Sequence, residues 1–439
     1  MKLSKMNTVR LALIASAIGC AFASVAGAGD SKATFGAAGW TQYGMIMKSL
    51  DTAEKKELDN RGMLGTGAQF AIQYQASERL GVTVGLGVGS GHNIAARATN
   101  GFYAPMGTGP YVSNANAKYS LWDEDKNNLF FQLGYFPYDY ATEAQNFGLY
   151  LVRGPVYPGL LVSGFETKNV LPVANTLGFQ VHHRSGMFEH EFLLTFDSEW
   201  YPYWDISPIY HASLHLGDAL RIGAGANLYH QIPVDKKMTT QDIIEVAYID
   251  TAAKDTTYIS FKGIKLGADF VFDVKPLLGG IEALGAEDLK IYGEVAVLGL
   301  DGDKAHNALY GPVSKRMPMM LGVNLPAFKF LDKLNVEVEY YGAQWVDDPS
   351  IYNHTSGPKV TPVPKKNATD TNTTKDNFKW SVYASKVIAD HVKISAQVAS
   401  DHFRPGIFQG YGDNNPPLNT APFFSPSEFY WTTKIAYFF

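Results

Sequence analysis

The stretch that decides the fold is FYWTTKIAYFF, residues 429–439. Its odd-numbered positions are aromatic or aliphatic except for one threonine: Phe429, Trp431, Thr433, Ile435, Tyr437 and Phe439. Because successive side chains of a β-strand point to opposite faces, the other face presents Thr432, Lys434 and Ala436. A strand with so continuous an apolar face needs an apolar partner, and we expect that partner to be lipid.

This stretch resembles the carboxy-terminal assembly signal of Gram-negative outer-membrane β-barrel proteins. In that signal a polar residue, a glycine and two aromatic residues stand at fixed positions before the end of the chain. Thr432, Tyr437 and Phe439 fill three of these positions, whereas Lys434 stands where the signal has glycine. The resemblance implies a barrel of the porin type, with outer-membrane lipid and the barrel assembly machinery as partners.

The amino-terminal residues are typical of a secretory signal peptide. Basic residues precede an apolar run over residues 11–25, and Ala26-Gly27-Ala28 provides small residues for cleavage. We therefore expect a signal peptide over residues 1–28 and a barrel over residues 29–439. Cys20 is the only cysteine and would leave with the signal, and the residues before it fit a lipid-attachment motif poorly.

Composition excludes two broad classes of protein. With 37 Lys and Arg against 42 Asp and Glu, the net charge of -5 is not that of a nucleic-acid binder. After the signal, no apolar run approaches the roughly 20 residues that a membrane-spanning helix needs. A barrel escapes this limit because only every second residue of each strand faces lipid.

Period-two alternation recurs along the chain and is clearest over residues 80–89, where Leu and Val alternate with Gly and Thr. It predicts an all-β fold, a transmembrane antiparallel up-and-down β-barrel of about 16 strands, with a range of roughly 14–18. The connections alternate between brief and long, as short periplasmic turns and long outer loops do. The strands are expected over residues 34–47, 67–76, 80–89, 115–122, 129–136, 177–183, 188–197, 209–216, 220–229, 258–273, 289–298, 317–325, 334–343, 378–387, 392–399 and 429–439.

The connection over residues 137–176 is unusual because its part from Asn146 to Glu166 is too apolar for an exposed loop. It could fold into the lumen and narrow the channel, with Arg153 and Glu143 at the constriction. Alternatively, it could form an extra hairpin that raises the strand count to about eighteen. We favour the first interpretation.

Strand phase places many charged side chains on the face that would line the lumen. Both signs occur, which predicts a water-filled pore with weak ion selectivity. The alternative is a network of paired charges that fills a closed barrel. The candidate pore-lining residues, besides Glu143 and Arg153, are Glu189, Glu191, Asp197, Arg221, Lys265, Asp269, Asp273, Lys290, Glu294, Glu337, Glu339, Lys379, Lys393 and Lys434.

The sequence offers no candidate for catalysis, for a cofactor or for a metal ion. No GxSxG motif occurs, and no serine has suitably spaced His and Asp partners. Two histidine pairs, His182 with His183 and His211 with His215, are poorly placed for one metal ion. Adjacent strand residues face opposite ways, and residues four apart are separated by about 13 Å.

These observations predict an outer-membrane channel for passive diffusion of ions and small hydrophilic solutes, not an enzyme. Its expected location is the outer membrane of a Gram-negative bacterium, and assembly as a homotrimer stays open. Two alternatives use the aromatic outer loops, Trp200–Trp204 and Phe403–Phe424, whose rings could stack on sugars. One is an adhesion or glycan-binding barrel, and the other is a sugar-selective channel.

Overall fold

The computed structural model describes most of the expected barrel wall and one long connection. The described residues are 33–49, 61–93, 106–124, 126–152, 175–196, 205–229, 231–232, 234, 263–279, 281–300, 313–315, 317–340, 378–400, 402–403 and 425–439. The expected signal peptide, Cys20, Arg153 and Asp197 lie outside these residues, as do the aromatic loops around Trp200 and Tyr411.

Strands dominate the described residues, as the alternation predicts. In chain order they are β1 (Ala33–Ser49), β2 (Arg61–Gln75), β3 (Leu80–Asn93), β4 (Met106–Glu124), β5 (Asn127–Pro137), β6 (Asn175–Ser185), β7 (Phe188–Phe196), β8 (Ile206–Leu216), β9 (Leu220–Tyr229), β10 (Gly263–Asp273), β11 (Lys290–Val297), β12 (Met319–Asn324), β13 (Lys333–Tyr340), β14 (Phe378–Ile388), β15 (Val392–Ser400), β16 (His402–Phe403) and β17 (Ser425–Phe438). Two short 3-10 helices, η2 (Lys275–Leu278) and η3 (Val313–Lys315), follow β10 and β11. No helix in the described part of the chain is long and apolar enough to cross a membrane.

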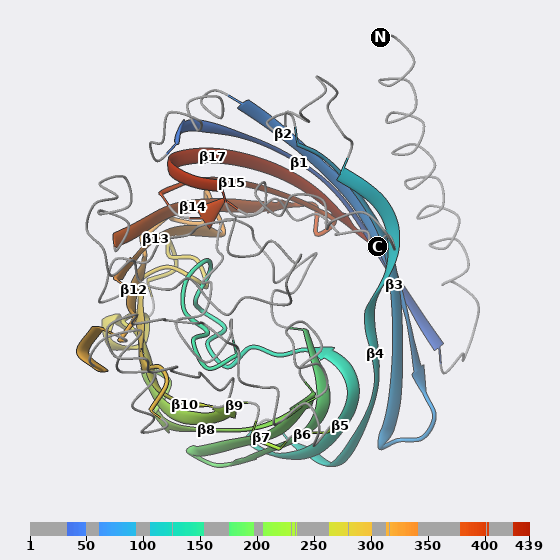
Figure 1. The fold of residues 1–439 in the computed structure, drawn as a ribbon. Coiled ribbons are helices and arrows are strands. Elements are labelled where there is room, and N and C mark those ends of the chain that lie inside the picture. Colours follow the sequence, from blue (N-terminus) through green and yellow to red (C-terminus); the bar gives the residue numbers. More distant parts are fainter. Residues whose placement is uncertain are drawn as a thin grey trace, which may run out of the picture.

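Antiparallel pairing closes these strands into a ring of sixteen (Figure 1). Each long strand pairs with its neighbours in sequence, and β17 pairs with both β15 and β1. The two-residue β16 pairs with the beginning of β17. The predicted all-β, up-and-down barrel of about 16 strands is therefore confirmed.

Burial alternates along the strands with a period of two, as the sequence pattern does. On β14, Lys379, Ser381 and Tyr383 are buried on the inner face, whereas Phe378 and Val382 are exposed on the outer face. On an ordinary sandwich the apolar face would be the buried one. Here the apolar face is the exposed one, as a wall between lipid and a polar interior requires.

Brief connections gather at one end of the barrel, which we call the short-turn end. Phe439 also lies there, because its backbone N–H donates to the carbonyl oxygen of Ala37 at 2.8 Å. Gly186 and Gly217 provide the left-handed backbone conformation of two of these turns, with φ of 60° and 66°. The brief connections at this end are residues 76–79, 125–126, 186–187, 217–219, 325–332 and 389–391.

The connection between β10 and β11 at the same end is longer and packs on its neighbour. The carboxylate of Asp288 accepts backbone N–H groups from Gly285, Ala327 and Phe328, at 2.8, 3.1 and 3.2 Å. The turn between β12 and β13 is thereby tied to residues 274–289.

Candidate functional site

Residues 138–152, which follow β5, lie within the ring of strands (Figure 1). We call them the inner segment. Its large side chains are almost fully removed from solvent: Phe147, Tyr150 and Leu151 are each 1% exposed. The sequence is too apolar here for an outer loop, and the chain buries these side chains against the inner wall of the barrel.

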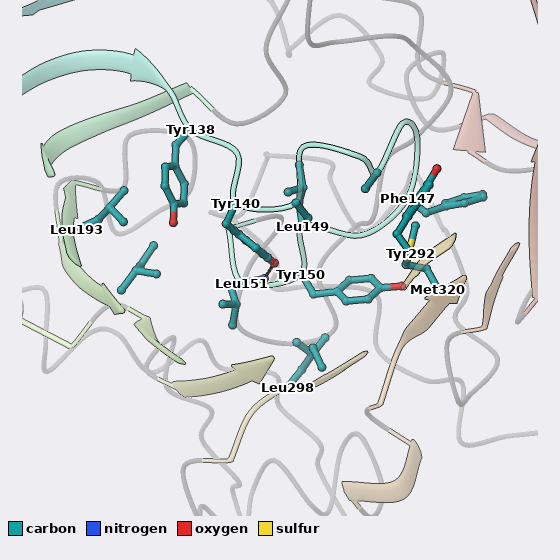
Figure 2. Packing of buried hydrophobic residues seen from close by; sticks show 14 of the residues in the cluster. Tyr138, Tyr140, Phe147, Leu149, Tyr150, Leu151, Leu193, Tyr292, Leu298 and Met320 are labelled. Atoms are coloured by element: carbon teal, nitrogen blue, oxygen red, sulfur yellow. Dashed lines mark hydrogen bonds between the residues drawn. The ribbon is translucent and has the colours of Figure 1, made fainter. Parts of the chain in front are cut away.

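Apolar packing holds the inner segment against one side of the wall. Figure 2 shows Tyr140, Leu149 and Leu151 projecting from the segment, and Tyr150 reaching toward Met320. The wall side chains in this cluster come from β5, from β7 to β12 and from the residue that follows β11, namely Phe136, Leu193, Ile209, Tyr229, Val271, Tyr292, Ala296, Leu298 and Met320.

The carboxylate of Glu337, on β13, binds the backbone at the middle of the inner segment. Three successive N–H groups, from Gln145, Asn146 and Phe147, donate to it at 2.6, 2.9 and 3.1 Å. The hydroxyl of Tyr292 donates to the same carboxylate at 2.6 Å. A carboxylate with no exposed surface is strongly destabilised unless it is hydrogen-bonded, and these donors satisfy it.

Glu294, on β11, binds the next turn of the inner segment in the same way. Its carboxylate accepts the N–H groups of Leu149 and Tyr150 at 2.6 and 2.9 Å, together with the hydroxyl of Tyr140. The hydroxyl of Tyr150 then donates to Glu339, on β13, at 2.7 Å. Three wall carboxylates thus receive five backbone N–H groups and two tyrosine hydroxyls of one loop.

The Tyr140 hydroxyl remains a proton donor at neutral pH. Burial raises the pKa of Tyr140 well above its ordinary value, and the nearby charge of Glu294 raises it further. The same hydroxyl accepts the backbone N–H of Leu151 at 3.0 Å, so it links two parts of the inner segment.

Three other wall residues bind the oxygens of the inner segment. Arg221 donates to the carbonyl of Tyr140 at 3.2 Å, and Asn227 donates to the carbonyl of Leu151 at 2.6 Å. The Lys333 ammonium lies 3.3 Å from the carbonyl oxygen of Glu143. Carboxylates therefore bind the N–H groups of this loop, while cationic and amide groups bind its carbonyls.

Glycine makes room for the inner segment at two places. Gly225 and Gly267 are register partners on β9 and β10, and a Cβ at either position would come within 2.6 or 3.1 Å of the Leu151 side chain. Gly148, at φ of 81°, lies so near Glu294 that a Cβ there would be 2.6 Å from its carboxylate. Wall and segment fit closely because these side chains are missing.

The candidate pore-lining residues that the structure describes lie on the inner face or on the inner segment. Lys265, Asp269, Glu294, Glu337, Glu339, Lys379 and Lys434 are buried there, and Glu189, Glu191, Arg221, Asp273, Lys290 and Lys393 are partly buried. Glu143 belongs to the inner segment, where its carboxylate lies 3.6 Å from Arg221. Sequence reasoning did not single out Asn227 or Lys333, because only the fold brings them to the segment. It also missed Tyr138 and Tyr140, because only the fold brings their hydroxyls to wall carboxylates.

Charge is unevenly distributed around the inner wall. The three carboxylates that bind the inner segment lie on β11 and β13. Lys379, Lys393 and Lys434 lie on the neighbouring β14, β15 and β17. Lys290 and Lys333 begin the same two strands, so both signs of charge occur behind the segment, whereas lysines lie beside it.

The residues of the expected assembly signal lie on both faces of β17. Tyr437 and Phe439 are exposed on the outer face, whereas Thr432 and Lys434 are buried on the inner face. The Lys434 ammonium lies 6.0 Å from the ring centroid of Trp40 on β1. A lysine fits at this position, where the signal has glycine, because its side chain turns into the polar interior.

No protein-family model and no curated protein matches the chain. Solved porin structures do match it. The high-pH structure of OprB from Pseudomonas putida aligns with a TM-score of 0.51 and 10% identity, over 93% of this chain and 95% of that one. A mutant of the Rh. blastica porin aligns with a TM-score of 0.44 and 9% identity, over 93% of this chain and 100% of that one. The chain thus has the fold of porin-type barrels.

Proposed function

We propose that the protein is an outer-membrane channel through which ions and small hydrophilic solutes diffuse passively, and that it is not an enzyme. The observation that carries this proposal is the inner segment: a loop held inside a polar barrel by Glu294, Glu337 and Glu339. Such a loop narrows a pore and leaves the wall intact, and passage past it needs no chemical step.

The charges of the lumen support weak ion selectivity. Carboxylates and lysines both occur on the inner wall, so neither sign of charge is alone there, and the carboxylates nearest the segment are taken up by hydrogen bonds to it. We therefore propose that the pore accepts both signs of ion and excludes solutes mainly by size.

The outer face of the barrel supports a proposal about its environment. Its exposed aliphatic and aromatic side chains suit the outer-membrane lipid of a Gram-negative bacterium, reached after removal of residues 1–28. We propose that Thr432, Tyr437 and Phe439 are read by the barrel assembly machinery. We also propose that three copies of the barrel assemble as a homotrimer.

Single-channel recording in planar bilayers tests the proposed function. The mature chain, refolded in detergent, should give discrete conductance steps with a weak preference between cations and anions. A folded barrel that never conducts but binds glycans or host surfaces would instead favour the adhesion alternative. Block of the current by oligosaccharides would favour the sugar channel.

A further inference from the structure

A group of one histidine and two glutamates lies on the inner wall near the short-turn end, beside the start of the inner segment. His182 on β6 is the register partner of Glu191 on β7, and Glu189 is the next inward residue toward the turn. The Nδ1 atom of His182 and one carboxylate oxygen of each glutamate all lie within 4.8 Å of one another. The spacing of residues along a single strand could not reveal this group, because its members come from two strands.

The separations suit a small divalent ion. His182 Nδ1 lies 2.8 Å from Glu191 Oε1 and 4.0 Å from Glu189 Oε1. Ligands bound at about 2.0–2.2 Å around a tetrahedral ion lie roughly 3.3–3.6 Å apart. Shifts of under about 1 Å along ordinary side-chain torsions would bring both pairs to that spacing.

We propose that His182, Glu189 and Glu191 bind a divalent transition-metal ion, with water completing its coordination. An imidazole nitrogen and two carboxylate oxygens are ligands that Zn²⁺ and its neighbours in the first transition row accept. Two carboxylates also match the charge of the ion. The proposal departs from the expectation, drawn from histidine pairs within single strands, that the chain has no metal site.

Neighbouring groups already hold the three ligands in place. The hydroxyl of Tyr138 donates to Glu191 Oε2 at 2.6 Å, and His215 Nε2 lies 2.7 Å from Glu189 Oε2. The ring of Phe130 stacks on His182, with 4.6 Å between centroids and 11° between planes. Hydrogen bonds of this kind orient metal ligands in proteins.

The group is accessible from the lumen without being fully hydrated. The side chains of His182 and Glu191 are 11% and 12% exposed, and that of Glu189 is 24% exposed. An ion can therefore enter from the pore, and few water molecules compete with it for the carboxylates. The proposal does not rest on the proposed function, since a folded barrel that never conducts would still bind the ion.

The test measures Zn²⁺ binding to the mature chain, made without a histidine tag, stripped with chelator and refolded in detergent. Titration calorimetry should give one ion per barrel, and Co²⁺ should show the visible absorption of a protein-bound ion. His182→Gln and Glu191→Gln should abolish binding. Tyr138→Phe should weaken it by about 10- to 100-fold, because only the orienting hydrogen bond is lost.

His190→Gln is the matched control. His190 lies on β7 between the two glutamates, but strand alternation turns it to the outer face, where its Nδ1 lies 2.7 Å from the hydroxyl of Tyr210. This variant should bind Zn²⁺ as the wild type does. Each protein is first shown to be folded by its heat-dependent migration on gels.

Three results would overturn the proposal. They are a folded wild type without saturable Zn²⁺ binding, a folded His182→Gln protein that binds as before, and equal loss in the His190→Gln control. If neither ligand variant folds, Tyr138→Phe decides the matter, because Tyr138 belongs to the inner segment and not to a wall strand. Unchanged affinity in this variant would contradict the proposed arrangement.

Discussion

The carboxylate of Glu337 accepts the backbone N–H of Phe147 at 3.1 Å, although 190 residues separate the two in the chain. This contact is one of five between wall carboxylates and backbone N–H groups of the inner segment. It links the inner wall to the loop that occupies the lumen. The position of the loop therefore depends on groups that a strand pattern marks only as inward-facing charges.

Glu337→Gln should loosen the inner segment while the barrel stays folded. The substitution replaces a carboxylate oxygen by an NH₂ group, which faces the N–H donors and cannot accept from them. Hydrogen bonds to charged groups contribute about 1.5–3 kcal/mol each, and each 1.4 kcal/mol lost raises the undocked population about tenfold. Single-channel records should therefore show larger or noisier steps.

Glu78→Gln is the matched control, because Glu78 is exposed in the turn between β2 and β3. It removes the same charge without touching the segment, and its records should match those of the wild type. Identical records for the wild type and Glu337→Gln would contradict the assigned role of Glu337.

Gly267 and Leu151 should behave as a coupled pair. In Gly267→Ala the new Cβ would lie 3.1 Å from Leu151 Cγ, so the segment must shift. Leu151→Ala alone removes a buried side chain, at a cost of about 2–5 kcal/mol to docking of the segment. The double variant should lose less docking free energy than the two single variants lose together, because the added methyl group enters the space that Leu151 left.

Hydrogen exchange measured by mass spectrometry on peptides covering residues 138–152 reports this coupling. We expect faster exchange in each single variant. In the double variant the increase in exchange should be smaller than the sum of the two single increases. Additive changes would show that Leu151 does not occupy the recess at Gly267.

Glu287, between β10 and β11, should make stability depend on pH. Burial acts to raise the pKa of Glu287, but the hydrogen bond and charge of Lys290, with Lys333 and Lys275, outweigh it and hold the pKa below its ordinary value. A folded pKa below the unfolded one, about 4.3, stabilises the folded state above that pH. The contribution is lost as the pH falls through the folded pKa.

Urea unfolding in detergent should show Glu287→Gln to be less stable than the wild type at pH 7, by under about 1 kcal/mol for a partly exposed pair. The difference should disappear in strong acid. A difference that grows as the pH falls would contradict the assigned direction of the pKa.

Deleting Phe439 should affect assembly in cells more than stability. Its side chain is 52% exposed on the outer face, and burying one Phe contributes only about 1.5–3 kcal/mol. Yield in the outer membrane should therefore fall more than the yield of refolding in detergent. Phe378→Ala removes a similarly exposed ring from β14 and is the control, for which the two yields should change together.

The wall of the barrel was predictable from sequence because its signal is local. Residues 220–229, 80–89 and 392–399 alternate strictly, and observed strands cover each of these ranges. Strand ends differ more from the prediction. The strand expected over residues 115–122 extends over Met106–Glu124, where glycine and proline interrupt the alternation.

The residues of the site were predictable only in part. The period-two alternation along each strand indicates that Glu294 and Glu337 face inward. It does not indicate that they bind a loop far away in sequence. The group around His182 shows the same limit, because register between β6 and β7 brings its members together. Local alternation determines only whether a side chain faces inward or outward, whereas contacts across the barrel depend on closure of the whole ring.

The measurement that tests the central claim most directly is the single-channel conductance of a variant in which residues 138–152 are replaced by a Gly/Ser segment of equal length. Equal length keeps the connection to β6 possible and removes the side chains that pack on the wall. If the inner segment narrows a water-filled pore, the folded variant should conduct in larger steps than the wild type. Equal conductance in two folded proteins, or none in either, would contradict a channel constricted by this loop.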